Sequence, residues 1–210
     1  SDAAFRQARQ QLDEMIARDA NRASIILWSL ANETPPGPAR QRFLEALAAH
    51  ARKLDPTRPL TAALNTQVAE GDRRIIEDPL AATIDVIGIN SYCGWYRGKP
   101  SECAGLRWVS EYAKPIIMSE FGAGALQGLH GEAAERWTEE YQAEVYRQNL
   151  AMLDAIGPLR GMSPWILKDF RSPRRPLAGI QDFWNRKGLL SETGEPKQAW
   201  QILRDYYRSR

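Results

Sequence analysis

The chain has 210 residues, of which 43% are hydrophobic and 26% are charged. These values are typical of a folded globular protein and exclude a disordered or fibrous chain. A net charge of +2 argues against a dedicated nucleic-acid-binding protein. The sequence holds no run of about 18 apolar residues that would cross a membrane. Cys93 and Cys103 are too few for a disulfide framework or a four-ligand zinc site; one bridge between them is possible, but the sequence does not support it.

Helix-like and strand-like patterns alternate through the first half of the chain. Apolar residues at helical spacing predict helices over residues 5–20 and 43–54. Between them, residues 24–31 form an almost continuous apolar run, which predicts a buried parallel strand. Two further short apolar runs, at residues 60–64 and 84–89, predict the next two strands.

The second half continues the same alternation. Its predicted elements are, in chain order, a short helix at 102–112, a strand at 115–119, a long helix at 132–156, a strand at 162–167, a polar loop at 169–186 and a last helix opened by Pro196. This alternation indicates an α/β fold with a parallel sheet. We expect one domain, because no repeat or linker interrupts the chain, but the pattern fits a doubly wound sheet as well as a barrel.

Polar and acidic residues follow several of the predicted strands. Glu33 comes directly after the first strand and Glu120 after the fourth. Ligands of parallel α/β folds bind at these carboxyl ends of strands. A carboxylate after a buried strand is costly unless it meets water, a partner or a substrate. The ordinary explanation for one such glutamate is that it caps a helix or forms a salt bridge in a loop. Two such carboxylates with aromatic neighbours favour a site instead, and paired carboxylates are the machinery of glycoside hydrolysis.

Two motifs carry a family resemblance. Residues 27–33, Leu-Trp-Ser-Leu-Ala-Asn-Glu, and residues 117–122, Ile-Met-Ser-Glu-Phe-Gly, resemble the two active-site signatures of glycoside hydrolase family 2. The resemblance implies a (β/α)8 TIM-barrel fold of which only strands four to eight are present. It also implies that Glu33, after strand four, is the general acid and base, and that Glu120, after strand seven, is the nucleophile. Further segments resemble the family in the same order, at 53–59, 90–96, 128–130 and 165–170.

The resemblance implies roles for other residues too. Asn32 is expected to bond the sugar 2-hydroxyl, and Tyr92 to donate to Glu120 and hold it ionised. Trp165 is expected to form the floor of the sugar pocket, and Asn90 is a further candidate sugar-binding residue. With carboxyl groups about 5–5.5 Å apart, the enzyme would retain the anomeric configuration by a double displacement. No metal or cofactor is expected.

The segment Asn185-Arg186-Lys187-Gly188 bears on the substrate. It resembles the Asn-x-Lys-Gly motif of β-glucuronidases, in which the amide and the ammonium grip the sugar carboxylate. This implies that Asn185 and Lys187, with help from Tyr96, bind a β-D-glucuronide. Such enzymes often carry an arginine where this chain has Gln181, and arginines earlier in the loop, Arg171, Arg174 and Arg175, are candidate substitutes.

That departure leaves a β-galacturonidase and a β-galactosidase of the same family open. A non-catalytic carbohydrate-binding remnant, or an inactive fragment, is the alternative from another class. The expected partner is a carbohydrate substrate, with no nucleic acid and no membrane, and a homo-oligomer of the full-length protein stays open. The compartment of this soluble protein is also open, between the cytoplasm and the periplasm or secretion.

Length then limits the domain assignment. A barrel of this type needs about 250 residues, and this chain begins with the helix before strand four. We therefore expect residues 1–210 to be a single portion of a catalytic domain, with the N-terminal barrel strands and β-sandwich domains absent. Strand four would then be an unpaired sheet edge, and the chain alone would be inactive or poorly soluble.

Overall fold

The computed structural model describes residues 1–65, 67–68 and 71–210. These residues divide into two compact units. The first consists of residues 1–90 and 108–117, and the second of residues 91–107 and 118–210. Within the described part of the chain, every helix is too short or too polar to pass through a bilayer.

The first unit contains a parallel sheet. Its strands are β1 (Trp28–Asn32), β2 (Leu60–Leu64) and β5 (Val86–Asn90), in the order β1-β2-β5. β7 (Ile116–Glu120) begins in this unit beside β5, where the Ile87 amide donates to the Pro115 carbonyl over 2.9 Å. β2 is buried along its whole length, as expected for a central parallel strand. The sheet confirms the predicted α/β class.

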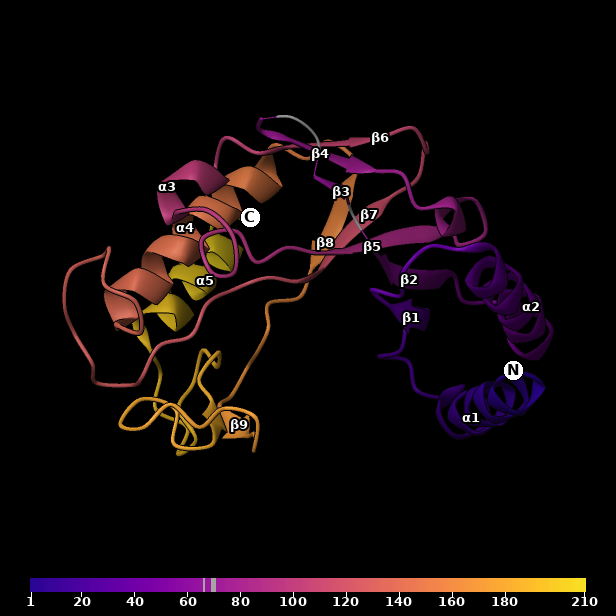
Figure 1. Cartoon of the computed structure of the whole chain (residues 1–210), viewed down its shortest axis with the longest axis horizontal. Helices are drawn as coiled ribbons and strands as arrows, with labels where there is room; N and C mark the ends of the chain where they lie inside the picture. Colours follow the sequence, from indigo (N-terminus) through magenta and orange to yellow (C-terminus); the bar gives the residue numbers. More distant parts are fainter. Residues whose placement is uncertain (66, 69–70) are drawn as a thin grey trace. The chain divides into compact units, whose positions relative to one another are not determined.

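Two amphipathic helices accompany these strands. α1 (Asp2–Asp19) and α2 (Pro38–Leu54) lie side by side in Figure 1, and the rings of Phe5 and Phe43 meet edge to face between them at 5.2 Å. The unit also holds a short 3-10 helix and a small second sheet with the order β3-β4-β6. These elements are η1 (Pro79–Ala82), β3 (Gln67–Val68), β4 (Arg73–Ile76) and β6 (Arg107–Ser110), whose residues 108–110 belong to this unit.

The second unit is built around α4 (Glu139–Asp154). Figure 1 shows α3 (Pro100–Cys103) and α5 (Gln198–Arg208) against this helix. Trp95, Tyr141 and Val145 form a buried hydrophobic cluster of this unit together with Ala123. The end of β7 and three further strands complete the unit. These strands are β8 (Leu159–Met162), β9 (Phe170–Arg171) and β10 (Trp184–Asn185), the last two forming an antiparallel pair.

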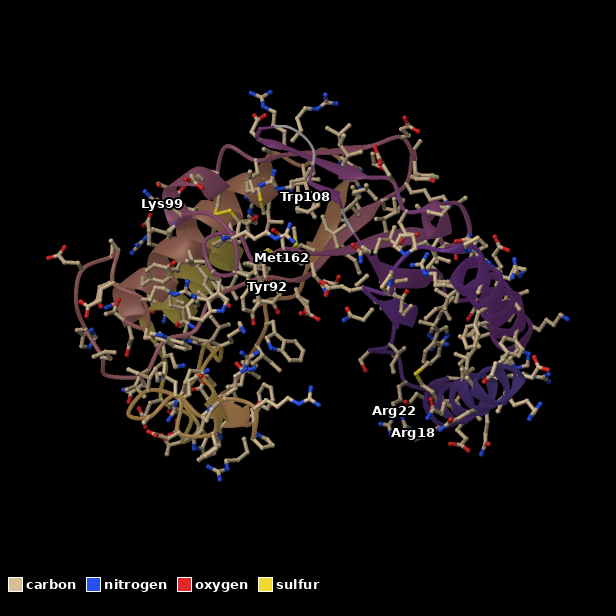
Figure 2. All side chains as sticks on the ribbon, viewed as in Figure 1. Arg18, Arg22, Tyr92, Lys99, Trp108 and Met162 are labelled. Atoms are coloured by element: carbon tan, nitrogen blue, oxygen red, sulfur yellow. A yellow bond between two sulfur atoms is a disulfide. The ribbon has the colours of Figure 1, made fainter. Side chains whose placement is uncertain are left out.

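A disulfide joins Cys93 to Cys103 in the second unit (Figure 2). The two Cα atoms lie 5.7 Å apart, and Cys103 is fully buried where α3 ends. The sequence alone did not support this bridge. It closes the loop that carries Trp95 and Tyr96.

Two predicted elements have the wrong type or place. The helix expected at 102–112 is wrong, because α3 ends at Cys103 and residues 107–110 form β6 in the small sheet, where Trp108 and Val109 suit a strand. The strand expected at 162–167 is also wrong. β8 covers Leu159–Met162 instead, and the segment after it contains a cis peptide bond between Trp165 and Ile166.

Two other elements are shorter than predicted. The strand expected at 24–31 begins only at Trp28, and it lies at the edge of the sheet with β2 as its neighbour in the described chain. Only Trp28 of this strand is buried, as its edge position allows, so the expectation of a continuously buried strand was wrong. The helix expected at 132–156 begins at Glu139, because Trp137 adopts a positive φ of 76° and Thr138 caps the first turn.

Candidate active site

Three candidate residues lie at the carboxyl ends of strands in the first unit. Asn32 ends β1, Glu33 follows it, and Asn90 ends β5. The amide of Asn90 donates to Asn32 Oδ1 over 2.9 Å, so the two side chains orient each other. Glu33 is exposed and has a φ of 48°, a left-handed conformation that is rare outside glycine. Such strained residues concentrate at functional sites.

Glu120 and Tyr92 meet in the second unit. Glu120 is the last residue of β7, and its backbone carbonyl accepts from the Ser91 amide over 2.9 Å. Tyr92, the next residue, donates from its hydroxyl to Glu120 Oε2 over 2.6 Å. The contact expected from the resemblance is therefore present. The register of the two segments brings the hydroxyl to the carboxylate.

The turn after Glu120 requires glycine. Gly122 has a φ of 137°, and a Cβ there would lie 2.9 Å from the Tyr146 hydroxyl and 3.0 Å from the Trp165 carbonyl. The Trp165 amide donates to the Phe121 carbonyl over 2.8 Å. This close approach fixes the backbone of the half-buried Trp165 beside the segment that carries Glu120.

Lys187 has an unusual environment for an ammonium group. The residue is only 4% exposed, and its Nζ donates to the Tyr96 hydroxyl over 2.6 Å. Nζ also lies over three aromatic rings, 4.7 Å from the centre of Tyr96, 5.4 Å from Tyr92 and 5.7 Å from Trp95. Among the residues that the structure describes, no carboxylate lies within salt-bridge distance of Nζ.

Burial dominates the electrostatics of Lys187. Desolvation lowers its pKa below the ordinary value, while the hydrogen bond to Tyr96 and the negative charge of Glu120 oppose the change. A buried ammonium that is not in contact with a carboxylate is costly, because burial removes the charge from bulk solvent without an adjacent counter-charge. An anionic ligand would supply the missing counter-charge.

The hydroxyl of Tyr96 accepts from two cations. Besides Lys187, Arg175 Nη2 approaches it at 3.4 Å. Burial of the phenol disfavours its ionisation, but the hydrogen bond from Lys187 and the charges of both cations prevail and lower the pKa of Tyr96. Two basic groups therefore converge on one oxygen, which concentrates positive charge at this point of the second unit.

Asn185 completes the motif. Its Oδ1 accepts from the Lys187 amide over 3.2 Å within a tight turn. Because the oxygen is engaged as an acceptor, the side chain presents its NH2 group as a donor. The segment 185–189 is fixed on one side by Ile166, whose amide donates to the Lys187 carbonyl over 3.0 Å.

α4 connects the aromatic loop and the lysine segment. Asn149 donates to the Cys93 carbonyl over 3.2 Å, and the hydroxyl of Tyr141 donates to the Gly94 carbonyl. From the same helix, Gln142 donates to the Gly188 carbonyl over 3.1 Å. One rigid helix thus anchors both the loop of Tyr92 and Tyr96 and the segment of Lys187.

Sequence reasoning missed part of this arrangement. Trp95 was not among the predicted site residues, although it lies under the ammonium of Lys187. Of the three arginines considered as substitutes at Gln181, Arg175 reaches Tyr96, whereas Arg171 stacks over Trp184. The only signal in the sequence that could have pointed to Trp95 was the high aromatic content of segment 90–96. No three His, Cys, Asp or Glu side chains gather to hold a metal ion in the described ranges.

Comparisons with known proteins agree with this geometry. The chain matches the family model of the glycosyl hydrolases family 2, TIM barrel domain, over residues 2–209. It is 36% identical to the β-glucuronidase of Rattus norvegicus in an alignment of 212 positions that covers 93% of this chain and 30% of that protein. The chain thus spans about a third of the length of the curated relatives that it matches.

The chain is also similar to solved structures. The β-glucuronidase of Faecalibacterium prausnitzii superposes with a TM-score of 0.81 at 30% identity, covering 98% of this chain and 35% of that one. A β-galacturonidase of Eisenbergiella tayi superposes with a TM-score of 0.81 at 26% identity, covering 98% of this chain and 37% of that one. The fold and motifs define a glycoside hydrolase barrel. This chain belongs to glycosyl hydrolases family 2, as part of its TIM-barrel domain.

Proposed function

We propose that the full-length protein is a retaining glycoside hydrolase that removes terminal β-D-glucuronic acid from its glycosides. The observation that carries the proposal is Lys187, a residue only 4% exposed whose ammonium donates to a phenol and lies over three aromatic rings. A uronate carboxylate would provide the negative charge that this group lacks. The β-glucuronidases among the relatives support the same substrate class.

Two carboxylates perform the proposed reaction. The Glu120 carboxylate attacks the anomeric carbon while Glu33 protonates the leaving glycosidic oxygen, which breaks the bond to the aglycone. The product of this step is a covalent glycosyl ester on Glu120. Glu33, now ionised, takes a proton from water as the water attacks the anomeric carbon and releases Glu120. Two inversions retain the β configuration.

Other residues orient the groups that react. Tyr92 bonds to one oxygen of Glu120 and leaves the other oxygen to attack. Asn32, held by Asn90, is proposed to bond the sugar 2-hydroxyl, a contact that strengthens in the transition state. Trp165 is proposed to stack under the apolar face of the sugar.

The carboxylate site is proposed to consist of Lys187, the Asn185 amide, Tyr96 and Arg175. Lys187 and Arg175 offer charge-assisted bonds, and Asn185 offers an amide donor. Gln181 stands where similar enzymes often have arginine, and its backbone lies in the turn before β10. Arg175 is the residue that we propose takes over that charge, because it already contacts Tyr96.

A β-D-galacturonide is the second candidate substrate. The likeness to the galacturonidase of Eisenbergiella tayi favours it, and the same carboxylate contacts would serve both sugars. The two sugars differ only in the configuration at C4. A neutral β-galactoside fits the site less well, because it would leave Lys187 buried without a counter-charge. A homo-oligomer of the full-length protein stays a prediction.

The test uses the full-length protein and a set of p-nitrophenyl β-glycosides, namely the glucuronide, the galacturonide, the glucoside and the galactoside. We expect hydrolysis of the glucuronide with the β anomer released first in the NMR spectrum. Glu120→Gln should lose about a thousandfold or more in kcat, the scale of removing a catalytic nucleophile. Glu132→Gln, at an exposed loop carboxylate, is the matched control and should keep full activity.

The role of Lys187 is tested by comparing a variant on the charged glucuronide and on the neutral glucoside. Lys187→Met should lower kcat/KM for the glucuronide about ten- to a hundredfold, the weight of one charged hydrogen bond. Hydrolysis of the β-glucoside should change little, since the glucoside lacks the carboxylate. Equal losses on both substrates would refute the carboxylate site. No turnover of glucuronide, galacturonide or galactoside by the wild type would refute the enzyme and favour a carbohydrate-binding role.

A further inference from the structure

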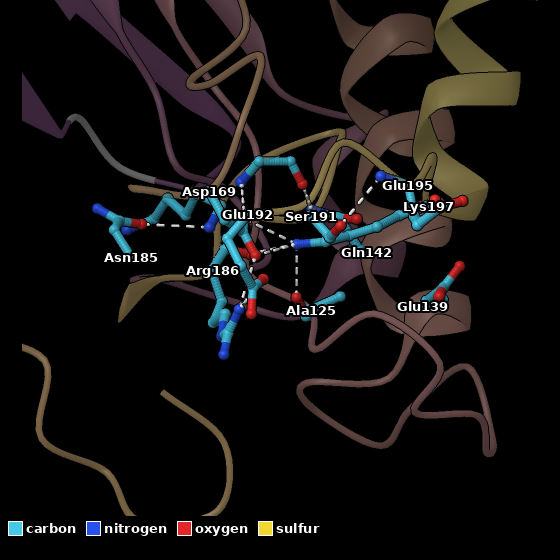
Figure 3. A network of polar contacts seen from close by, with 12 residues as sticks. Ala125, Glu139, Gln142, Asp169, Asn185, Arg186, Ser191, Glu192, Glu195 and Lys197 are labelled. Atoms are coloured by element: carbon cyan, nitrogen blue, oxygen red, sulfur yellow. Dashed lines mark hydrogen bonds and ion pairs between the residues drawn. The ribbon is translucent and has the colours of Figure 1, made fainter. Parts of the chain in front are cut away.

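A buried ion network lies beside the Lys187 segment (Figure 3). Lys197 and Asp169 have fully buried side chains, and Lys197 Nζ donates to Asp169 Oδ1 over 2.8 Å and to Oδ2 over 3.0 Å. The ammonium also donates to the carbonyls of Ala125, at 2.7 Å, and Arg186, at 3.1 Å. The network thus fixes one carbonyl of the lysine segment directly.

Both chain neighbours of Lys187 belong to this network. The Gly188 amide donates to Asp169 Oδ1 over 2.7 Å, and Arg186 Nη1 approaches Asp169 Oδ2 at 3.3 Å. The Arg186 guanidinium also bonds to Glu192 at the rim of the network. Residues 186 and 188 are therefore both held by Asp169, and the side chain between them is directed toward Tyr96.

Asp169 packs so closely against Gly188 that no side chain fits between them. A Cβ on Gly188 would lie 2.3 Å from the Asp169 amide nitrogen and 2.5 Å from Asp169 Oδ1. Gln142, on α4, adds a hydrogen bond to the Gly188 carbonyl. The ion pair thus bonds to the backbone on both sides of Lys187, with Asp169 accepting from the Gly188 amide and Lys197 donating to the Arg186 carbonyl.

We propose that Asp169 and Lys197 are positioning residues for uronate recognition, which hold Lys187 at the sugar carboxylate without touching the substrate. This inference rests on the proposed function. A buried ion pair contributes little net stability compared with apolar residues of the same size, so stability alone does not explain it. Its bonds to the backbone on both sides of Lys187 give it a specific task, since a binding group must be held within about 0.5 Å of its working position.

The experiment compares variants of the full-length enzyme on p-nitrophenyl β-D-glucuronide and the matching β-D-glucoside. Asp169→Asn keeps the shape of the side chain and removes its charge. We expect KM for the glucuronide to rise about ten- to a hundredfold, the effect of a small displacement of a binding group. The kcat for both substrates and KM for the glucoside should change less than threefold, an effect under about 1 kcal/mol.

A double-mutant cycle separates positioning from general damage. In a Lys187→Met background, Asp169→Asn should raise the glucuronide KM no further, because the group that it positions is absent. Asp78→Asn is the matched control, since Asp78 is equally buried and pairs with Arg40 at 2.6 Å in the first unit. It should lower the melting temperature comparably and leave the ratio of the two KM values unchanged.

Milder variants cover the case in which Asp169→Asn does not fold. Glu192→Gln removes a charge at the network's rim, where the side chain is 30% exposed, and should raise the glucuronide KM by a smaller factor. Lys197→Arg should restore much of the selectivity that Lys197→Met loses. If Lys187→Met abolishes the uronide preference but no network variant alters it, the positioning role is wrong and the proposed function stands. A wild type without uronide preference would overturn both.

Discussion

Lys187 Nζ and the Tyr96 hydroxyl lie 2.6 Å apart, and the pKa of each group is lowered. Burial lowers the pKa of Lys187, and the neighbouring cations lower that of Tyr96 against its burial. Both groups therefore lose a proton at a lower pH than an exposed lysine or tyrosine does. Either loss lowers the net charge of the proposed carboxylate site by one unit, because the ammonium becomes neutral or the phenol becomes an anion.

The first prediction is an alkaline rise of KM that is specific to uronides. Below the lowered pKa values the site carries its full charge, and above them it has lost one unit, so uronide binding weakens as pH rises. KM for the glucuronide should climb from neutral to alkaline pH while KM for the glucoside stays level, as measured in initial-rate assays. A parallel rise for both sugars would assign the titration to another group.

The second prediction concerns the Tyr96 hydroxyl. Tyr96→Phe keeps the ring under the ammonium but removes its hydrogen bond, and should raise KM for the glucuronide about tenfold. The control is Tyr206→Phe, which loses a 2.6 Å bond to Asp154 outside the site and should leave KM unchanged. An unaltered KM in Tyr96→Phe would exclude the phenol from carboxylate binding.

The third prediction separates Tyr92 from the carboxylate site. Tyr92→Phe removes the bond to Glu120 Oε2, so the nucleophile loses its orientation for every substrate. We expect kcat to fall about tenfold for glucuronide and glucoside alike, the value of a hydrogen bond to a charged group. Single-turnover measurement of the glycosylation step would report the loss directly. A loss confined to the glucuronide would place Tyr92 with Lys187 instead.

Local sequence patterns predicted the elements but not their long-range contacts. Periodicity identified α1, α2 and β2, and the motif residues Glu33 and Glu120 fell at strand ends as expected. It misassigned β6, because the strand's partner β4 lies more than 30 residues earlier in the chain and pairing across that distance leaves no local signal.

The same limit applies to the candidate site. Tyr96 and Lys187 were expected from motifs, but their direct bond joins residues 91 positions apart. Asp169 lies in segment 165–170, which resembles the family, but nothing in the sequence connected it to Lys197. A lysine before a helix is ordinary in sequence, and its role becomes visible only through the carboxylate beside it.

The fourth prediction concerns the disulfide between Cys93 and Cys103. The bridge spans a sequence separation of 10 and encloses Trp95 and Tyr96, so opening it frees the loop that meets Lys187. By restricting the unfolded chain, a bridge over a loop of this length stabilises the folded state by about 3 kcal/mol. The double variant C93A/C103A should show faster hydrogen exchange in residues 91–107 and a higher glucuronide KM.

Reducing agent supplies the control for that variant. It should raise KM in the wild type by the same factor and leave C93A/C103A unchanged, since the variant has no bridge to open. Glucoside KM should respond less than glucuronide KM, because the loop meets the lysine that would bind the carboxylate through Tyr96. If reduction altered exchange in the loop but neither KM, α4 would be sufficient to hold Tyr96, through its bonds to the carbonyls of Cys93 and Gly94.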